Sequence, residues 1–375
     1  MEYRNFDNLG IKASLLGYGC MRFPTENGRI NEAEAEKLLD TAIASGVNYI
    51  DTAYPYHGGE SEPFTGRVLK KYPRDSYFLA TKLPCWEVNS LDDAKRLFSE
   101  QLKRLGMEYV DFYLLHSLSG ESYRRMKELG VPEFCDELKK QGKIRYFGFS
   151  FHDGFDAFKE IITDRQWDFC QLQINYMDVD EQAGIKGYEL AKSMNVPVIV
   201  MEPVKGGSLA ALPDEIYAPL NKCRKGASPA SWALRWVGSL DNVKVILSGM
   251  SDMAQVKDNL ATFTDFEPLS PEESALIKNT ADSLRKRVYN GCTGCRYCMP
   301  CPAGVNIPEN FKIWNTYGIY SNKCSTLWQW EHDIPDSQKA KSCVGCGKCE
   351  SACPQKISIR DDLARLQAQL DSLSE

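Results

Sequence analysis

Two cysteine runs near the C-terminus have spacings that suit metal ligation. Nine of the fourteen cysteines fall within residues 292–353 of a 375-residue chain. The second run, CVGCGKCESACP, follows C-x2-C-x2-C-x3-C-P, the bacterial ferredoxin spacing for 4Fe–4S clusters. The first run, CTGCRYCMPCP, is one residue shorter in its last gap. Three thiolates spaced by two residues can hold one side of a cubane, so the sequence predicts two [4Fe–4S] clusters.

The cysteine before each proline is expected to serve the other cluster. The predicted ligand sets are Cys292, Cys295, Cys298 and Cys353 for one cluster, and Cys301, Cys343, Cys346 and Cys349 for the other. Zinc is the weaker interpretation, because zinc sites usually use pairs of cysteines and a closed site needs only four ligands. Disulfides are also disfavoured, because they need an oxidising compartment and the sequence shows no targeting signal.

A second set of residues with chemical potential lies at the ends of predicted strands. Asp51 ends one strand and Tyr56 lies in the loop after it, while Lys82 and His116 close the next two strands. Taken singly, each residue could have a purely structural role, either as a solvated residue at the rim or as a buried group with its hydrogen bonds formed. Together they suit carbonyl reduction. The tyrosine would donate a proton to the carbonyl oxygen, the lysine would lower the tyrosine pKa, the aspartate would pair with the lysine, and the histidine would orient the substrate.

These residues need a scaffold that brings strand ends together. Short apolar runs alternate with amphipathic helical patterns along residues 1–285. The predicted strands are 13–19, 47–53, 77–83, 110–116, 144–150, 169–175, 196–202 and 243–249. Eight such units predict a (β/α)8 TIM barrel, whose chemistry sits at the C-terminal strand ends. A doubly wound open sheet is the alternative, weakened because no G-x-G-x-x-G follows the first strand.

At this point the chain resembles the aldo-keto reductase family, in the branch with a C-terminal ferredoxin-like domain. Asp51, Tyr56, Lys82 and His116 match that family's tetrad in type, order and spacing. The segments YRNFDNLGIKASLLGYGCMRFP and GVNYIDTAYPYHGGESE also resemble the family's N-terminal patterns. The resemblance implies an NAD(P)H-dependent oxidoreductase that reduces an aldehyde or ketone, with Tyr56 as proton donor. On position alone, Trp86, Tyr54 and the loop after His116 (118–132) would line the substrate pocket.

The resemblance also implies a nicotinamide dinucleotide site across the later strand ends. The expected contacts are Ser150, Gln171, Met201, Lys205, Gly206, Gly207, Ser248, Gln255 and Asn259. Packing or helix capping is the alternative role for several of these residues. Where the family usually has Ser-Asn at the end of the fifth strand, this chain has Ser150-Phe151, so one amide contact is missing or is supplied by His152 or Asn175.

The choice between NADP and NAD is left open by the segment after the last strand. Members of the family that prefer NADP place Lys or Arg there to pair the 2′-phosphate, since a dianion needs charge-assisted partners. Here those places hold Gly249 and Gln255, although Lys257 is close in sequence. Either cofactor is therefore expected.

Composition and charge limit the remaining possibilities. We expect the barrel in residues 1–285, a two-cluster ferredoxin-like domain in 286–360 and a C-terminal helix in 361–375. The net charge is −6, yet residues 286–360 hold ten Lys and Arg against five Asp and Glu. We interpret this excess as offsetting anionic clusters rather than binding nucleic acid, with docking of an acidic redox partner as the alternative. No apolar run approaches the ~20 residues of a membrane span and no signal peptide is visible, so a soluble cytoplasmic protein is predicted.

Two further functions stay open. The chain could be an electron-transfer or redox-sensing protein, in which the barrel is a scaffold and the clusters bind a redox partner protein. Alternatively, the clusters could be structural. Hydride transfer moves two electrons together, whereas each cluster accepts one, and the sequence has no flavin-binding signature to split the pair. The partner expected for the reductase itself is a small-molecule carbonyl substrate.

Overall fold

The computed structural model describes residues 1–374 and contains two compact units. The first unit comprises residues 1–206 and 230–274, and the second comprises residues 207–229 and the chain from Ala275 onward. We keep the boundaries 1–285, 286–360 and 361–375 as a proposal for the domains.

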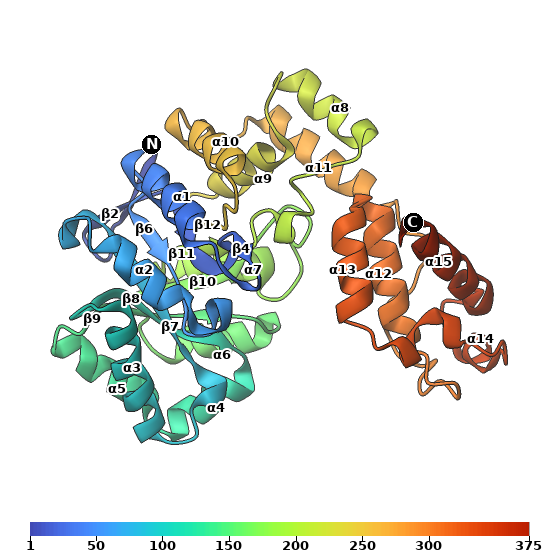
Figure 1. Cartoon of the computed structure of the whole chain (residues 1–375), viewed down its shortest axis with the longest axis horizontal. Coiled ribbons are helices and arrows are strands. Elements are labelled where there is room, and N and C mark those ends of the chain that lie inside the picture. The colour runs from blue at the N-terminus through green and yellow to red at the C-terminus, as the bar shows by residue number, and fades with distance from the viewer. Residues whose placement is uncertain (375) are drawn as a thin grey trace. The chain divides into compact units, whose positions relative to one another are not determined.

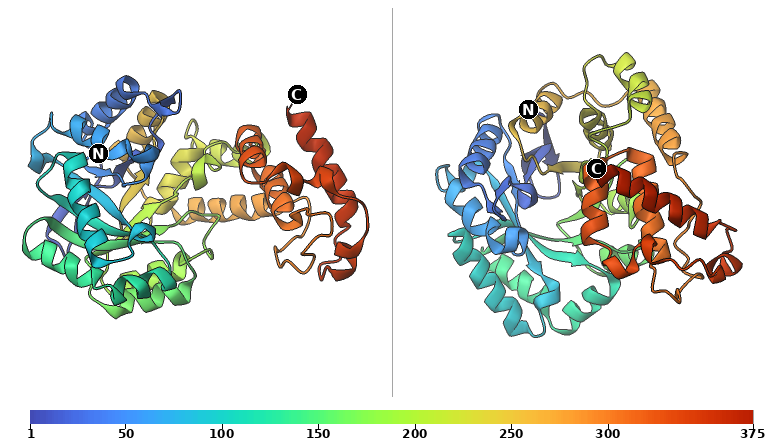
Figure 2. Two further views of the ribbon diagram at one scale, coloured as in Figure 1. Left: turned by 60° about the horizontal axis from the view of Figure 1, so that its bottom comes forward. Right: turned by 45° about the vertical axis from the view of Figure 1, so that its right-hand side comes forward.

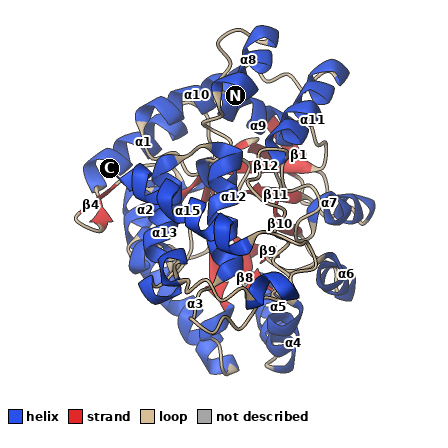
Figure 3. Cartoon of the chain, turned by 90° about the vertical axis from the view of Figure 1, so that its right-hand side faces the viewer, coloured by secondary structure: helices blue, strands red, loops and turns tan. Residues whose placement is uncertain are grey.

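The first unit is built around a closed barrel of parallel strands, which helices surround (Figures 1 and 3). The order around the barrel is β10-β11-β12-β3-β6-β7-β8-β9. The strands are β3 (Leu16–Gly19), β6 (Tyr49–Asp51), β7 (Phe78–Pro84), β8 (Val110–Leu118), β9 (Ile144–Phe151), β10 (Phe169–Gln173), β11 (Val198–Met201) and β12 (Val243–Ser248). Each overlaps a predicted strand, so the (β/α)8 prediction is confirmed. Their apolar sequences fit strands that are covered on both faces.

The helices of the first unit follow the strands along the chain. They are α1 (Glu32–Ala44), α2 (Ser61–Leu69), α3 (Leu91–Leu105), α4 (Gly120–Glu128), α5 (Val131–Lys140), α6 (Phe155–Asp164), α7 (Gly184–Ser193), α9 (Pro229–Gly238) and α10 (Met253–Thr264). Asn31 caps the N-terminus of α1, because its side chain accepts a hydrogen bond from the backbone N–H of Glu34 at 3.2 Å. Such a cap satisfies an otherwise unpaired N–H of the first turn.

The barrel interior is packed with aromatic side chains. The ring of Phe112 on β8 lies 4.9 Å from those of Tyr49 on β6 and Phe169 on β10, and these three strands are not adjacent. Phe6 lies 5.8 Å from the same ring. Phe6 belongs to an antiparallel hairpin of β1 (Tyr3–Phe6) and β2 (Ile11–Ser14). A second short hairpin joins β4 (Thr25–Glu26) to β5 (Arg29–Ile30).

The second unit is helical and has its own core (Figure 2). Its helices are α8 (Asp214–Cys223), most of α11 (Pro271–Arg285), α12 (Ile307–Tyr320), α13 (Lys323–His332), α14 (Lys348–Ala352) and α15 (Ile359–Ser374). Trp314 of α12 stacks on Tyr289 at 4.6 Å and donates to Gln369 of α15 at 2.7 Å. Within residues 1–374, no helix has the length and apolar character needed to cross a membrane.

Candidate functional site

The four tetrad candidates lie at the C-terminal ends of adjacent strands. Asp51 is the last residue of β6, and Lys82 and His116 lie in β7 and β8, which follow it in the barrel. Tyr56 begins a short 3-10 helix in the loop after β6, spanning Tyr56–Gly59. The fold therefore brings together residues that are up to 65 positions apart in the sequence.

Lys82 is the centre of a buried polar chain. Its Nζ donates to Asp51 Oδ1 at 2.5 Å, to the carbonyl oxygen of Thr52 at 2.9 Å and to Tyr56 Oη at 3.2 Å. The Lys82 and Asp51 side chains are 1% and 3% exposed. A buried ammonium is costly unless it is paired and hydrogen-bonded, and these three acceptors satisfy it. Burial alone would lower the pKa of Lys82, but Asp51 and Tyr56 hold that pKa above its ordinary value.

The pKa of Tyr56 departs from the expectation of the sequence. Burial is the largest influence and raises the pKa of Tyr56, and Lys82 offsets only part of that rise. The sequence argument considered the lysine but not the depth at which the phenol lies. Tyr56 is therefore protonated at neutral pH, which is the state that a proton donor needs.

His116 lies beside Tyr56 and is uncharged. The two rings meet edge to face at 6.0 Å, and the Trp86 ring lies 5.0 Å from the imidazole. Burial, followed by the charge of Lys82, lowers the pKa of His116 to about 2. Its buried Nδ1 has no hydrogen-bond partner among residues 1–374. Trp86 is 49% exposed, so its ring forms an open apolar wall next to the imidazole.

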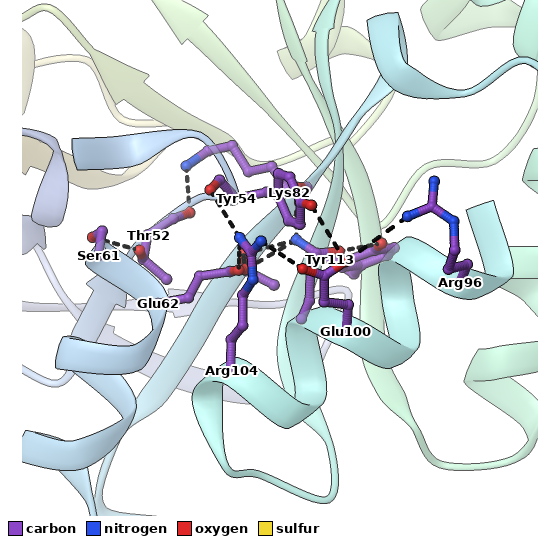
Figure 4. A network of polar contacts seen from close by, with 11 residues as sticks. Thr52, Tyr54, Ser61, Glu62, Lys82, Arg96, Glu100, Arg104 and Tyr113 are labelled. Carbon is purple, nitrogen blue, oxygen red and sulfur yellow. Dashed lines mark hydrogen bonds and ion pairs between the residues drawn. The ribbon is translucent and has the colours of Figure 1, made fainter. Parts of the chain in front are cut away.

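A second polar network supports the strand that carries Lys82 (Figure 4). Glu62 of α2 is fully buried and accepts from Thr81 Oγ1 at 2.7 Å and from Gln101 Nε2 at 3.0 Å. Gln101 also donates to the Lys82 carbonyl oxygen at 2.9 Å and accepts from the Tyr113 hydroxyl at 2.8 Å. Burial raises the pKa of Glu62 to about 7. This network was not predicted from the sequence. The pattern that could have indicated it is a polar residue on the buried face of a helix, as with Glu62 in α2 and Gln101 in α3.

The predicted contacts to the nicotinamide lie on β9, β10 and β11, which are neighbours in the barrel. Ser150 is paired in register with Gln171, and its hydroxyl accepts from the Ser117 N–H at 2.8 Å. Gln171 Nε2 donates to Met201 Sδ at 3.7 Å, while its buried Oε1 has no partner within the described chain. A buried unpaired oxygen is costly, so this position suits a ligand that brings an N–H donor, such as a carboxamide.

Both polar atoms of the Asn175 side chain already form hydrogen bonds within the protein. Its Nδ2 donates to Asp178 Oδ2 at 2.9 Å and to the Glu202 carbonyl oxygen at 3.2 Å. Its Oδ1 accepts from the backbone N–H groups of Met177 and Asp178, both at 3.0 Å. Asn175 thus holds two loops in place, which leaves the exposed His152 as the candidate for the missing amide contact.

Three predicted contacts near β12 are engaged in packing and capping. The Asn259 amide donates to Ser248 Oγ at 2.9 Å, and both side chains are buried. Gln255 accepts from the Ser251 N–H at 3.0 Å and donates to Asp252 Oδ2 at 2.8 Å, at the start of α10. These contacts order the loop between β12 and α10.

Lys205, one of the expected dinucleotide contacts, already has a counter-charge. Its Nζ lies 2.6 Å and 2.7 Å from the two carboxylate oxygens of Asp178, which is 7% exposed. Gly206 and Gly207 follow with φ values of +62° and +99°. This left-handed backbone suits glycine, which has no Cβ to clash.

The cysteine runs line two hollows in the second unit. The first hollow, of about 330 Å³ including space open to solvent, is lined by Cys292, Cys295, Cys298 and Cys353. The second, of about 320 Å³ measured in the same way, is lined by Cys301, Cys343, Cys346 and Cys349. Each hollow takes three cysteines from one run and one from the other. This is the crossed grouping that the sequence predicts.

The chemistry of the residues around each hollow can be compared with that of an iron–sulfur site. Within residues 1–374, no group of three or more His, Cys, Asp or Glu side chains is placed to hold a metal ion. None of the fourteen cysteines forms a disulfide. In a 4Fe–4S site the four thiolates sit at the corners of a multi-atom cluster. Four cysteines spread around a hollow match that requirement.

Two family models match the chain. The model described as "Aldo/keto reductase family" matches residues 15–282, and the model described as "4Fe-4S dicluster domain" matches residues 291–358. The first match covers the barrel with all four tetrad candidates, and the second covers both cysteine runs.

Individual proteins resemble the barrel. L-galactose dehydrogenase of Arabidopsis thaliana is 27% identical over 301 residues, covering 74% of this chain and 92% of that protein. The NADH-specific methylglyoxal reductase of Escherichia coli K12 is 26% identical over 332 residues, covering 74% and 97%. The holo form of an aldo-keto reductase from Bacillus halodurans has 26% identity and a TM-score of 0.63, covering 75% of this chain and 96% of that one. The chain therefore belongs to the aldo/keto reductase family of oxidoreductases and carries a C-terminal 4Fe–4S domain.

Proposed function

We propose that the protein uses NADPH or NADH to reduce an aldehyde or ketone, with Tyr56 as the proton donor. The observation that carries this proposal is the buried chain Asp51–Lys82–Tyr56, with contacts of 2.5 Å and 3.2 Å. When bound, the nicotinamide supplies a hydride to the carbonyl carbon. Tyr56 gives its proton to the carbonyl oxygen, and the Lys82 ammonium stabilises the phenolate that remains. Asp51 keeps that ammonium charged and in place.

His116 and Trp86 are proposed to receive the substrate. A neutral imidazole can present an N–H to the carbonyl oxygen without competing for the proton of Tyr56. The exposed face of Trp86 offers apolar contact to the rest of the molecule. Since two relatives are named for L-galactose and methylglyoxal, sugars and small α-oxoaldehydes are the first substrates to test.

The dinucleotide is proposed to lie across the ends of β9 to β12. Support comes from the unpaired buried oxygen of Gln171, beside Ser150 and Met201, which fits the carboxamide of a nicotinamide. The remaining proposed contacts are Lys205, Gly206, Gly207, Ser248, Gln255 and Asn259. We make no choice between NADP and NAD from these residues.

Two [4Fe–4S] clusters are proposed for the second unit, one in each hollow and each with the crossed ligands that line it. A second candidate function is electron transfer or redox sensing, with the barrel as a scaffold. It is favoured by the exposure of one cysteine at each hollow, Cys295 and Cys346, because an exposed ligand would put a cluster edge within reach of a partner protein.

The replacement Tyr56→Phe tests the reductase. The anaerobically prepared holoprotein is assayed for carbonyl-dependent oxidation of NADPH and NADH, with methylglyoxal and aldoses as substrates. Loss of a general acid should lower kcat by about 100-fold or more, with dinucleotide affinity unchanged. Tyr72→Phe is the matched control, since its hydroxyl donates to Asp40 Oδ1 of α1 at 2.6 Å and it lies outside the tetrad and the predicted pocket. Wild-type rates in Tyr56→Phe would contradict the proposal.

The two candidate functions are separated by mixing the holoprotein with NADH or NADPH alone. Bleaching of the cluster absorbance and a new EPR signal, without any carbonyl compound, would favour electron transfer between nicotinamide and clusters. Clusters that stay oxidised while an added aldehyde is reduced would favour an independent reductase barrel.

A further inference from the structure

The barrel mouth holds a cation that the sequence pattern did not identify. Arg22 ends the 3-10 helix η1 (Cys20–Arg22), directly after β3. Strand β3 neighbours β12, which in turn neighbours β11. The loops after these three strands therefore meet at one edge of the mouth. Gly249 lies in the loop after β12, and Gly206 in the loop after β11.

The side chain of Arg22 passes over Gly249 and reaches toward Gly206. A methyl group placed on Gly249 would lie 3.0 Å from Cβ and 3.1 Å from Cγ of Arg22. A methyl group placed on Gly206 would lie 3.8 Å from Nη2 of the same arginine. The alkyl part thus packs on one glycine, and the guanidinium lies at the other. The lack of a side chain at Gly249 makes room for Arg22.

The backbone that carries Arg22 is firmly held. Cys20 and Phe23, on either side of it, are buried, and the Phe23 ring packs edge to face on Phe64 at 4.9 Å. The Cys20 carbonyl oxygen accepts from Ser61 Oγ at 3.3 Å. The arginine itself is exposed and forms no ion pair within residues 1–374. A fixed backbone lowers the entropy that is lost when such a side chain engages a ligand.

Apart from Arg22, the charged side chains described near Gly206 are a lysine that is already paired and a glutamate. Lys205 is bound to both oxygens of Asp178, so its charge is matched. Glu202 Oε2 would lie 3.6 Å from the methyl group placed on Gly206, so an acid is close to the same point. A pyrophosphate carries two negative charges and needs charge-assisted donors, for which the planar guanidinium is well suited.

We propose that Arg22 binds the pyrophosphate of the dinucleotide, with its side chain running over Gly249 to the turn at Gly206. This inference deepens the proposed function, on which it rests. Because NAD and NADP share the pyrophosphate, Arg22 should contribute equally to the binding of both.

Isothermal titration of the anaerobic holoprotein with NADH and with NADPH tests the proposal. Arg22→Ala should raise Kd for both by about 10-fold, whereas Arg96→Ala, which removes an exposed arginine paired with Asp93, should leave both unchanged. Unchanged binding in Arg22→Ala would overturn the inference. Loss for NADPH alone would also overturn it, by assigning Arg22 to the 2′-phosphate. If the wild type binds neither dinucleotide, the proposed function fails as well.

A double-mutant cycle tests the path of the side chain. The Gly249→Ala methyl group meets only Arg22 atoms within 4 Å among its three nearest neighbours, so it should displace the arginine and weaken dinucleotide binding. In an Arg22→Gly background the same replacement should have little further effect, because the Cβ, Cγ and Cδ atoms that the methyl group meets are all removed. Additive losses would contradict the proposed path of Arg22.

Discussion

Replacing Asp51 by asparagine should destabilise the barrel strongly at neutral pH. The change keeps the shape of the side chain but removes the charge that lies 2.5 Å from Lys82 Nζ. The ammonium would then have only neutral acceptors, namely the amide oxygen of the replacement, Tyr56 Oη and the Thr52 carbonyl oxygen, in a site where the Lys82 side chain is 1% exposed. Breaking a buried pair in this way costs about 3–5 kcal/mol in the free energy of unfolding.

The loss should depend on pH in a defined direction. In the wild type the pKa of Lys82 is held above its ordinary value, so the stability that it contributes is present below the pKa of the unfolded chain and is lost as pH rises through the folded pKa. Without Asp51, burial is the largest remaining influence and moves the pKa of Lys82 downward. The unfolded variant then holds its proton longer than the folded one, so the stability of the variant rises with pH. The difference between the two proteins should be largest near pH 7 and shrink toward about pH 10.

The assay is urea unfolding of the anaerobic holoprotein, followed by far-UV circular dichroism at pH 7, 8.5 and 10. Asp92→Asn is the control, since that residue is 90% exposed and its pairing with Lys95 should be worth less than about 1 kcal/mol. The double variant Asp51→Asn/Lys82→Met should recover most of the loss because no charge remains buried. A loss below about 1 kcal/mol at pH 7, or a loss that does not shrink at high pH, would refute the argument.

Two further replacements test the close contacts and the cysteine grouping. Cys353→Ala should lower the iron content from about eight to about four atoms per chain. Adding Cys292→Ala should remove no more, whereas adding Cys301→Ala should empty both sites. Loss of all iron in both double variants would mean that each run holds its own cluster. Gly66→Ala should lower the free energy of unfolding in urea by about 3 kcal/mol, because the added methyl group would lie 2.0 Å from the Leu105 carbonyl oxygen. Gly154→Ala is the control and should lower it much less, because its methyl group meets nothing within 4 Å. Equal losses in the two variants would argue against this packing contact.

Much of the fold and part of the candidate site could be predicted from the sequence. Eight apolar runs at regular spacing have few architectures open to them, so the barrel followed from their pattern. Once the strands were placed, Asp51, Lys82 and His116 had to meet, because parallel strands of a barrel end at the same rim. The crossed grouping of the cysteines comes from the ferredoxin spacing and stays a prediction, which the lining of the two hollows supports.

The features that could not be predicted depend on how deeply a side chain is buried and on contacts between loops that are distant in the sequence. The pKa of Tyr56 is set by how deeply the phenol is buried, and no local pattern gives that depth. The pairing of Lys205 with Asp178 joins two loops whose approach is decided by the turns between them. Arg22 is separated from Gly249 by most of the barrel sequence. From the sequence alone, Gly249 indicated only that a basic residue was absent there, whereas the structure places Arg22 beside it.

The crossed lining of the two hollows also dictates when they can be completed during synthesis. Cys298 and Cys353, which line the same hollow, are 55 residues apart. At a translation rate of about 5–20 residues per second, the earlier thiols wait about 3–11 s for the last one to be made. The other hollow likewise waits for Cys343, Cys346 and Cys349. With the proposed crossed ligands, neither site has a full ligand set until Cys353 and the second run have been made, so we expect a truncation before Cys343 to leave both sites incomplete.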